Sequence, residues 1–491
     1  MHADVATIAN ALDEAQLLLE QHGAHPATVS GITDDSRRVT PGSLFVAVRG
    51  TERDGHDYLD AAARAGASLA ILQDAGRTSL PSLVVNDGRR AAAIAGAAAY
   101  GWPARQLQIV GVTGTNGKTT TVNMLRHLLD DPAARSASIG TLGVLIGSEG
   151  APCDGGGGLT TPGPIELQRL FRDLYDQGVR RVAMEVSSHS LDQGRVEGVF
   201  FDVATFTNLT RDHLDYHVTM DRYFAAKAKL LDHVVPHGSV VFNLDDQAWA
   251  QLHTDRRRVA FSERVSTAEV HAEDIRFGPR GSEWTLRVDA ERANVRLPLI
   301  GDFNVTNALG AAATAYALGM SAERIADRLS TMPQVPGRLE VIHESPTVLR
   351  DYAHTPDALA RALDAVRPFA RRRLIAVFGC GGDRDRGKRP EMGAIAESKA
   401  DLAIVTSDNP RTENPEAILD DIERGMAGTN HERIEDRRAA IARALSVAER
   451  EDVVVLAGKG HETYQVRGTT KYPFDEKAIV NELASDGAER A

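Results

Sequence analysis

The residues best suited to chemistry lie in a glycine-rich segment, GVTGTNGKTTT, at positions 111–121. The segment follows an apolar run, QLQIVGV (106–112), and leads into a helical pattern, so it predicts a loop between a strand and a helix. In such a loop, backbone N–H groups and the helix N-terminus can surround phosphate oxygens. The Lys118 ammonium would attract the β- and γ-phosphates, and the Thr119 hydroxyl would reach a Mg²⁺ ion. The predicted nucleotide site comprises Gly114, Thr115, Asn116, Gly117, Lys118, Thr119 and Thr120.

This loop departs from the strict G-x-x-x-x-G-K-[ST] pattern, because Val112 occupies the position of the first glycine. An ordinary glycine turn ahead of a buried helix is therefore an alternative interpretation. The succession of strand, Gly-Lys-Thr and helix favours phosphate binding.

Three further residues could take part in chemistry. Glu185 lies near the end of the apolar run RVAMEV (181–186), and ligands bind at the carboxyl ends of strands in open α/β sheets. A glutamate there can bind Mg²⁺ or pair with an arginine, and both interpretations stay open. His213 in RDHLDYH can be a ligand or a structural histidine. Lys227 in YFAAKAKLL lies on a predicted helix, where a lysine is normally a solvated surface residue.

A second polar group lies in the C-terminal third of the chain. Asp408 and Asn409 of the DNPR motif follow a predicted strand, and Pro410 restricts the backbone. Arg411 can then offer a planar fork of N–H donors to a carboxylate. A capped loop leading to a helix that begins near Pro415 is the alternative, and without further context it is the better one.

The elements that must hold these residues form three blocks. Residues 1–105 predict a small α/β unit that ends at a break in the pattern, Trp102-Pro103. Residues 106–336 alternate buried-type strands with helices, which is typical of a parallel sheet covered on both faces. An alternating pattern between about Glu269 and Ile300 predicts a small antiparallel annex to this P-loop-type domain. The expected strands of the two blocks are 43–48, 68–73, 82–87, 106–112, 181–186, 202–208 and 239–243, and the expected helices of the first block are 58–67 and 89–100.

Residues 337–491 repeat the alternation and predict a doubly wound, Rossmann-like domain, so the expected fold class is α/β with three domains. The helix after Asn304 is expected to end near Gly319. The patch CDGGGG (153–158) predicts a mobile loop. The expected strands of the last block are 347–353, 373–379, 401–407 and 452–458.

Composition excludes several classes of protein. The 491 residues are 42% hydrophobic and 25% charged, an ordinary globular balance. A net charge of -12 without a basic stripe argues against nucleic-acid binding. The N-terminus has no signal-peptide pattern and no apolar run reaches the ~20 residues that span a bilayer, so no membrane insertion is expected. Two cysteines, Cys153 and Cys380, fit a reducing cytoplasm.

The GTNGKT variant resembles the nucleotide loop of the Mur ligases and of the related folylpolyglutamate synthases. The likeness to the Mur ligases continues through nearly the whole chain. It is carried by DDSRRVTPGSLFVAV (34–48), TTPGP (160–164), MEVSSHSLDQGRV (184–196), TNLTRDHLDYH (207–217), YFAAKAKLL (223–231), GDFNVTNALGA (301–311), PGRLE (336–340), DYAHTPD (351–357), FGCGGDRDRGKRP (378–390), DNPR (408–411) and GKGHETYQ (458–465). The resemblance implies a UDP-MurNAc domain (1–105), an ATP domain (106–336) and an amino-acid domain (337–491). It implies a cytoplasmic, monomeric, ATP-dependent ligase of peptidoglycan synthesis.

The same resemblance implies the roles of residues near the nucleotide. Lys118, Glu185, His213 and Lys227 would form the catalytic set, and Thr119 would join the last three as ligands of Mg²⁺. The family's matching lysine is carbamylated by CO₂, which implies a metal-binding carbamate at Lys227. Further contacts to ATP are implied for Asn304, Asn307, Arg338 and Asp351. Asn304 could instead cap its own helix.

The implied substrates are UDP-MurNAc-L-Ala-D-Glu and meso-diaminopimelate, joined through an acyl phosphate. In the family, the arginine of DNPR marks enzymes that take meso-diaminopimelate, because L-lysine has no distal carboxylate for it. The nucleotide-dipeptide site is implied to contain Ser36, Thr160, Thr161, Ser187, Gln193 and Arg195, and the amino-acid site Arg384, Asp408, Asn409, Pro410, Arg411, Gly458 and Glu462. Helix capping is the alternative for Thr160 and Thr161.

Three other functions are consistent with parts of the sequence. A folylpolyglutamate synthase-type ligase shares the loop, but it lacks a uridine-nucleotide domain ahead of it. A P-loop kinase or nucleotide switch would not need the DNPR and GKGHE motifs. A noncatalytic sugar-nucleotide binder would not need Lys118, Glu185 and His213. Because the loop and the DNPR motif fall in different domains, closure about Pro336-Gly337 is expected.

Overall fold

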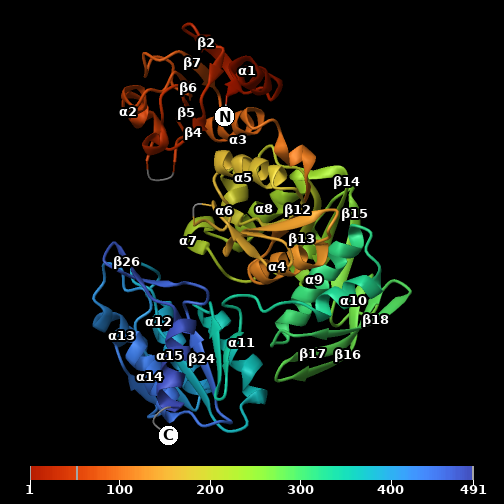
Figure 1. Cartoon of the computed structure of the whole chain (residues 1–491), viewed down its shortest axis with the longest axis vertical. Helices are drawn as coiled ribbons and strands as arrows, with labels where there is room; N and C mark the ends of the chain where they lie inside the picture. Colours follow the sequence, from red (N-terminus) through yellow and green to blue (C-terminus); the bar gives the residue numbers. More distant parts are fainter. Residues whose placement is uncertain (1, 51–52, 157, 489–491) are drawn as a thin grey trace. The chain divides into compact units, whose positions relative to one another are not determined.

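The structure is a computed structural model that describes residues 2–50, 53–156 and 158–488. The chain divides into two compact units, whose helices and strands are coloured along the sequence in Figure 1. Unit 1 extends from the N-terminal residues through Ala272 and also contains Leu286–Ala293 and Asn307–Arg328. Unit 2 contains Glu273–Thr285, Asn294–Thr306 and the chain from Leu329 onwards.

The N-terminal part of unit 1 is built around one sheet. Its elements are β1 (Ala3–Asp4), α1 (Val5–Glu14), β2 (Leu18–His22), β3 (Thr28–Val29), β4 (Ile32–Thr33), β5 (Leu44–Val46), α2 (Leu59–Arg64), β6 (Leu69–Leu72), β7 (Ser82–Val85) and α3 (Gly88–Ala99). The strand order is β2-β7-β6-β5-β4, with β4 to β7 parallel and β2 antiparallel to β7. Leu44 and Val46 belong to the core that includes α1 and α3, whereas Phe45 belongs to a second core with α2. Burial on both faces explains why the predicted strands are apolar throughout.

The central sheet of unit 1 holds the glycine-rich loop. Its elements are β8 (Gln108–Thr113), α4 (Lys118–Leu129), β9 (Arg135–Gly140), β10 (Gly143–Ile146), β11 (Ala151–Cys153), α5 (Pro164–Asp176), β12 (Val179–Glu185), α6 (Ser188–Asp192), β13 (Phe201–Phe206), α7 (Leu214–His217), α8 (Met220–Ala228), β14 (Val234–Asn243) and β15 (Arg257–Ser262). The order is β11-β10-β9-β12-β8-β13-β14-β15, and all strands from β9 to β15 in this order are parallel. The predicted strands 106–112, 181–186, 202–208 and 239–243 become β8, β12, β13 and β14.

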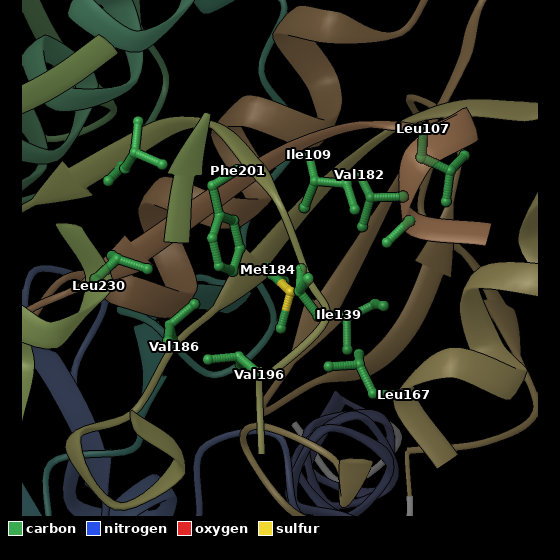
Figure 2. Close-up of a cluster of buried hydrophobic side chains, with 14 of the residues drawn as sticks. Leu107, Ile109, Ile139, Leu167, Val182, Met184, Val186, Val196, Phe201 and Leu230 are labelled. Carbon is green, nitrogen blue, oxygen red and sulfur yellow. The ribbon is translucent and has the colours of Figure 1, made fainter. Parts of the chain in front are cut away.

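One face of this sheet packs on a large apolar cluster. Val182 and Met184 of β12 and Phe201 of β13 contribute to it from the strands, and Leu167 contributes from α5 (Figure 2). Glu185 is the next residue of β12 after Met184, and the register places it beside Val112 of β8. The core therefore fixes the carboxyl ends of β8 and β12, from which the candidate site extends.

The expected antiparallel annex corresponds to three successive strands. They are β16 (Val270–Gly278), β17 (Gly281–Val288) and β18 (Glu291–Leu297). In β17 every second residue is buried, which is the period-two pattern that predicted these strands. Two helices follow, α9 (Phe303–Ala317) and α10 (Ala322–Ser330), and Gly319 has a φ of +91° after α9, as expected for a residue that ends a helix.

Unit 2 contains the C-terminal sheet. Its elements are β19 (Glu340–Glu344), β20 (Thr347–Asp351), α11 (Pro356–Val366), β21 (Leu374–Phe378), α12 (Lys388–Lys399), β22 (Leu402–Val405), α13 (Pro415–Glu423), β23 (His431–Arg433), α14 (Arg437–Val447), β24 (Val453–Ala457), β25 (Tyr464–Arg467), β26 (Thr470–Pro473) and α15 (Glu476–Ala488). The order β19-β20-β24-β21-β22-β23 is parallel except for β19. Cores lie on both faces, one with α11, α12 and α13 and one with α14 and α15. This is the doubly wound arrangement.

The N-terminal, central and C-terminal parts each have their own sheet with helices, so the expected three-domain α/β fold is confirmed although the first two sheets lie in unit 1. The boundaries 1–105, 106–336 and 337–491 stay predictions. The break expected at Trp102-Pro103 is a left-handed Trp102 followed by a 3-10 helix, Pro103–Gln106. Of the expected loop 153–158, Cys153 ends β11 and Gly157 lies outside the described residues. No helix among the described residues is long and apolar enough to cross a membrane.

Candidate active site

The loop between β8 and α4 requires glycine at two positions. Gly114 has a φ of +148° and Gly117 a φ of +84°, values that side-chain-bearing residues rarely adopt. A Cβ on Gly114 would lie 1.9 Å from Thr207 Oγ1, and one on Gly117 would lie 2.2 Å from Asn307 Oδ1. The loop is therefore closely packed, and the predicted nucleotide residue Asn307 lies directly against it.

The backbone of the loop is held by residues that the sequence did not single out individually. Thr115 N donates to the Asn208 carbonyl oxygen (2.7 Å), and Asn116 N donates to Asn208 Oδ1 (2.9 Å). Thr207 Oγ1 donates to the Asn116 carbonyl oxygen (2.7 Å). Asn208 lies in the TNLT segment that carried part of the family resemblance, which was the only pattern pointing to it.

The loop leads into α4 in the manner expected of an anion site. Thr119 and Thr120 are buried in its first turn. In the described part of the chain, no side chain caps this helix end. The positive end of the helix dipole therefore faces the loop.

Lys118 and Lys227 meet at one carbonyl group. Lys118 Nζ donates to the Gly114 oxygen (2.8 Å) and to the Thr115 oxygen (2.7 Å). Lys227 Nζ donates to the same Gly114 oxygen (2.7 Å). The structure thus brings together two of the predicted catalytic residues, which lie more than 100 positions apart in the sequence.

Lys227 is not a surface residue, so the solvated-lysine interpretation is wrong. Its side chain is buried, because α8 packs Tyr223, Ala226 and Lys227 inward at helical spacing. The ammonium lies 4.5 Å from the centre of the Tyr223 ring. Burial lowers the pKa of Lys227 well below its ordinary value, and the Lys118 ammonium lowers it further.

Glu185 is buried at the end of β12. One carboxylate oxygen accepts from Thr141 N (2.8 Å), and the other is hydrogen-bonded to the Thr141 hydroxyl (3.2 Å). A Cβ on Gly140 would lie 2.3 Å from the Glu185 carboxylate, so that glycine makes room for it. Within the described residues Glu185 has no arginine partner. Of the two interpretations of this residue, pairing with an arginine is therefore not observed.

His213 lies at the opening of α7 in a left-handed conformation, with a φ of +53°. Its side chain is 45% exposed, and its ring lies 4.8 Å from that of His189. Partial burial lowers the pKa of His213, which the Asp212 carboxylate opposes. Burial, followed by the rings of His213 and His217, lowers the pKa of His189 to about 4. Both rings therefore favour the neutral form.

The predicted metal ligands fit a hard divalent cation by type, with a hydroxyl at Thr119, a carboxylate at Glu185 and an imidazole at His213. Among the described residues, the Glu185 carboxylate accepts hydrogen bonds from Thr141 only, so its oxygens keep lone pairs for a cation. Across residues 2–50, 53–156 and 158–488, no group of three or more His, Cys, Asp or Glu side chains is placed to hold a metal. The ligand set thus stays a prediction.

Most residues predicted for the nucleotide-dipeptide substrate lie together next to Glu185. Thr161 Oγ1 donates to the Glu185 carbonyl oxygen (2.9 Å) and accepts from Ser187 N (3.1 Å). Arg195 donates to the Thr161 carbonyl oxygen (3.2 Å) and to Gln193 Oε1. These contacts leave hydroxyl, amide and guanidinium groups at one edge of the sheet.

The two remaining residues of this set are placed differently. Thr160 Oγ1 is hydrogen-bonded to Thr141 Oγ1 (3.3 Å), whose own hydroxyl reaches Glu185. Residue Gly163 precedes α5 without a side-chain cap in the described structure, so the capping interpretation of the Thr-Thr pair is wrong. Ser36 begins a 3-10 helix in the N-terminal part of unit 1.

Three residues predicted for ATP belong to unit 2. Asp351 accepts from Leu339 N (2.7 Å) and Ala353 N (2.8 Å), and burial raises its pKa. The Arg338 guanidinium lies 4.8 Å from the centre of the Tyr352 ring. Asn304 Nδ2 donates to the carbonyl oxygen of Ile300 (2.8 Å), at the beginning of α9. In this structure Asp351 and Asn304 organise backbone turns.

The predicted amino-acid site lies at the carboxyl ends of β21, β22 and β24. Arg411 has a φ of +50°, and its Nη1 donates to the Gly382 carbonyl oxygen (2.7 Å). A Cβ on Gly381 would lie 2.8 Å from Arg411 Nη1 and 3.9 Å from Arg384 Cγ, so this glycine separates the two arginines. The loop that carries Arg411 leads to a capped helix at Pro415, as the alternative interpretation expected, and substrate binding by Arg411 stays a prediction.

A buried lysine that the sequence did not single out lies at the centre of the acidic part of this site. Lys459 Nζ donates to Asn409 Oδ1 (3.1 Å) and Glu462 Oε2 (3.2 Å) and lies 3.6 Å from Asp408 Oδ1. Asn409 Nδ2 also donates to Glu462 (2.9 Å). Gly458, with a φ of +115°, packs against the Asp408 carboxylate. The structure thus joins the DNPR and GKGHE motifs through Lys459.

Sequence profiles of one family match three consecutive parts of the chain. The profile described as Mur ligase family, catalytic domain, matches residues 28–103. The Mur ligase middle domain matches residues 112–315, and the Mur ligase, glutamate ligase domain, matches residues 337–460. Together these matches cover well over half of the chain.

Individual relatives match over nearly the full length. The UDP-N-acetylmuramoyl-L-alanyl-D-glutamate--2,6-diaminopimelate ligase of Geobacillus kaustophilus is 43% identical over 470 residues, covering 94% of this chain and 95% of the relative. The protein of the same name from Synechococcus elongatus is 44% identical over 477 residues, with the same shares covered. A solved structure of a ligase with that name has a TM-score of 0.68 at 32% identity and covers 96% of this chain and 98% of its own.

Proposed function

The chain belongs to the Mur ligase family, and we propose that it is the ATP-dependent ligase that joins meso-diaminopimelate to the D-Glu of UDP-MurNAc-L-Ala-D-Glu. This reaction is a step in the synthesis of peptidoglycan precursors. Relatives named for this activity match 94% of the chain at 43% and 44% identity. We propose further that the enzyme works in the cytoplasm as a monomer.

One observation carries the catalytic part of the proposal. Lys118 and Lys227 both donate to the Gly114 carbonyl oxygen, at the loop that precedes α4. The first step of a carboxylate-activating ligase must bring two anions together, namely a carboxylate and the γ-phosphate of ATP. The Lys118 ammonium and a helix N-terminus lower the free energy of that encounter.

The reaction then proceeds in two steps. An oxygen of the D-Glu γ-carboxylate attacks the γ-phosphorus, the bond to the bridging oxygen breaks, and ADP leaves. The amine of meso-diaminopimelate attacks the carbonyl carbon of the resulting acyl phosphate, phosphate leaves, and the nitrogen releases a proton. Lys118 stabilises charge on the phosphates, while Thr161, Ser187 and Arg195 orient the dipeptide end of the substrate.

Magnesium ions would neutralise charge on the transferring phosphate. Thr119, Glu185 and His213 are the residues that we propose to hold them, since they supply the ligand types that this cation accepts. Thr141 would orient Glu185, because it contacts both oxygens of the carboxylate. We also propose that Asn304, Asn307, Arg338 and Asp351 serve the nucleotide.

We propose that Lys227 carries a carbamate. Burial and Lys118 lower its pKa, which favours the neutral amine, and only the neutral amine has a lone pair that can attack CO₂. Attack forms a nitrogen–carbon bond and releases one proton, leaving an anionic carbamate. The product has oxygen ligands for a cation and would turn the repulsion by Lys118 into attraction.

The choice of meso-diaminopimelate is supported by the mixed charges of the second site. Arg384 and Arg411 can pair with a carboxylate, whereas Asp408 and Glu462 suit an ammonium group. L-Lysine would leave an arginine without its partner. A site built to hydrogen-bond a substrate group rejects an analogue that lacks this group, because polar groups of the site are then left unpaired, and the discrimination is roughly 100-fold or more.

A phosphate-release assay tests the proposal. Purified enzyme with ATP, Mg²⁺ and UDP-MurNAc-L-Ala-D-Glu should release phosphate continuously only when meso-diaminopimelate is added. L-Lysine should support turnover at least about 100-fold less efficiently. Release without the dipeptide substrate would indicate a nucleotide switch, and equal use of L-lysine would contradict the assigned amino acid.

A further inference from the structure

The two loops that carry Arg384 and Arg411, the arginines proposed to bind substrate, are hydrogen-bonded to each other. They are residues 380–386, which follow β21, and residues 409–413, which follow β22, and we term them the arginine loops. Gly382 N donates to the Asn409 carbonyl oxygen (2.9 Å), and Arg411 Nη1 donates back to the Gly382 carbonyl oxygen (2.7 Å). Arg384 and Arg411 therefore extend from a single double-loop layer.

A buried ion pair lies beneath this layer. Arg389 of α12 is 1% exposed at its side chain and makes a two-point contact with Glu413, with Nη2 to Oε1 at 2.8 Å and Nη1 to Oε2 at 3.2 Å. Glu413 Oε1 also accepts from Asp383 N (2.5 Å) on the other arginine loop. The second partner of Arg389 is Asp421 of α13, at 2.8 Å. Glu413 thus connects both loops to a rigid helix.

A second link lies on the exposed side of the layer. Thr412 Oγ1 donates to Asp383 Oδ1 (2.8 Å), and Thr412 N donates to Asp383 Oδ2 (3.2 Å). Hydrogen bonds from Arg389 lower the pKa of Glu413 to about 2, so this carboxylate keeps its charge at neutral pH. Because Arg389 and Arg386 both pair with Glu413, this carboxylate does not have to be neutralised by the substrate arginines.

We propose that Arg389 and Glu413 are positioning residues that fix the relative position of the Arg384 and Arg411 side chains, so that both can bind the carboxylate of the incoming amino acid. This inference rests on the proposed function, which assigns the two arginines to that substrate. A two-arginine site needs such support, because each guanidinium extends from a separate loop on a flexible side chain. Loss of the pair should therefore weaken amino-acid binding more than nucleotide binding.

The test compares Glu413→Gln and Arg389→Lys with a matched control, Asp421→Asn. The control removes the other carboxylate that contacts Arg389 but touches neither arginine loop. Steady-state KM for meso-diaminopimelate, the Kd for ADP and the thermal midpoint are measured for each full-length variant. Thr412→Val leaves both members of the buried pair in place, since Thr412 is exposed and, among the described residues, its hydroxyl is hydrogen-bonded to Asp383 only.

We expect the two buried-pair variants to raise the KM for meso-diaminopimelate roughly tenfold or more, with the Kd for ADP changed less than about twofold. Thr412→Val should raise the same KM by a smaller factor. Asp421→Asn should lower the thermal midpoint but leave the KM for meso-diaminopimelate unchanged. Equal KM values for Glu413→Gln and Asp421→Asn would overturn the inference. If Glu413→Gln does not fold, an unchanged KM in Thr412→Val and Arg389→Lys would do the same. A wild-type enzyme that ignores meso-diaminopimelate would instead refute the proposed function.

Discussion

Replacement of Lys227 by alanine should nearly abolish ligation without unfolding the protein. Lys227 is buried, and its ammonium shares the Gly114 carbonyl oxygen with Lys118. If this residue is an anionic carbamate in the working enzyme, its removal takes away a group that binds cation and orients the acyl phosphate. Loss of one preorganised electrostatic contact of this kind lowers kcat about 100- to 1000-fold.

The structure also limits how strongly Lys118 would repel a charged Lys227. The two hydrogen bonds to Gly114, 2.8 and 2.7 Å, limit the separation of the Lys118 and Lys227 nitrogens to 5.5 Å. At an effective dielectric constant of about 20, two like charges at that distance repel by about 3 kcal/mol or more. A neutral amine removes this repulsion, and a carbamate reverses its sign. Unmodified, charged Lys227 would therefore destabilise the folded state.

The assay measures ADP release with all substrates present. Activity of Lys227→Ala should recover in part when a short carboxylic acid is added, because the acid can occupy the space of the missing carbamate. Lys229→Ala is the matched control, since Lys229 belongs to the same segment but is 46% exposed and pairs with Asp192 at the surface. Native mass spectrometry of the wild-type protein should show the mass of one added CO₂, which is lost on acidification.

Three results would refute the reasoning on Lys227. The first is full activity of Lys227→Ala without any added acid. The second is an equal loss of activity in Lys229→Ala, which would point to a general effect on α8. The third is a wild-type enzyme that turns over at the same rate in buffers freed of CO₂ and carries no added mass.

Three other changes have defined outcomes. Lys118→Ala should abolish turnover but leave the circular dichroism spectrum unchanged, and substantial residual ligation would contradict its phosphate role. Arg411→Lys should raise the KM for meso-diaminopimelate about 10- to 100-fold by removing a planar fork while the Kd for ATP stays constant; an unchanged KM would exclude this contact. Arg389 lowers the pKa of Glu413 from 4.5 to about 2. The stabilising contribution of the ionised Glu413 carboxylate is thus present above pH 4.5 and is lost as the pH falls towards 2. In urea denaturation, the free energy of unfolding of Glu413→Gln should therefore fall less over that pH range than that of the wild type.

The strands of the two doubly covered sheets could be predicted from the sequence because both of their faces are buried. In β24, Val453, Val455 and Ala457 face one core while Val454 and Leu456 face the other, so the run is apolar at every position. Periodicity alone does not distinguish such a run from a buried helix, but its short length identifies it as a strand.

Other strands escaped prediction for an equally physical reason. β9 reads RSASIG, and its buried Ser136 and Ser138 give it no apolar run. The hydroxyl of Ser136 is satisfied by the Arg126 carbonyl oxygen at 2.5 Å, a contact made by a residue ten positions away. A buried polar side chain with a distant partner cannot be distinguished from a loop residue by periodicity alone.

The candidate site was predictable where its residues share one loop and was not where they meet across elements. The glycines at 114 and 117 follow from the phosphate-loop pattern, and their positive φ values agree with it. The support of Glu185 by Thr141 was not predictable, because Thr141 follows β9, a strand that the sequence did not reveal. The same holds for Lys459, whose burial depends on the juxtaposition of two loops after β22 and β24.

Some buried cations among the described residues pair with a carboxylate and Lys227 does not, and this difference is informative at Lys227 because it lies at the phosphate loop. Arg437 and Glu476 are fully buried and pair at 2.7 Å, and Lys459 has Glu462 at 3.2 Å, so each of these cations has a carboxylate that offsets its desolvation. Lys227 is equally buried, yet its contacts are a carbonyl oxygen, an aromatic ring and a second lysine, and a nearby aspartate offsets only part of the cost. A fold under selection for stability alone would replace such a lysine with an apolar residue of similar volume, at no loss. Its retention is explained if the working form of the residue is an anion, because a carbamate would pair with Lys118 and convert an unfavourable buried charge into a partner for the phosphate loop.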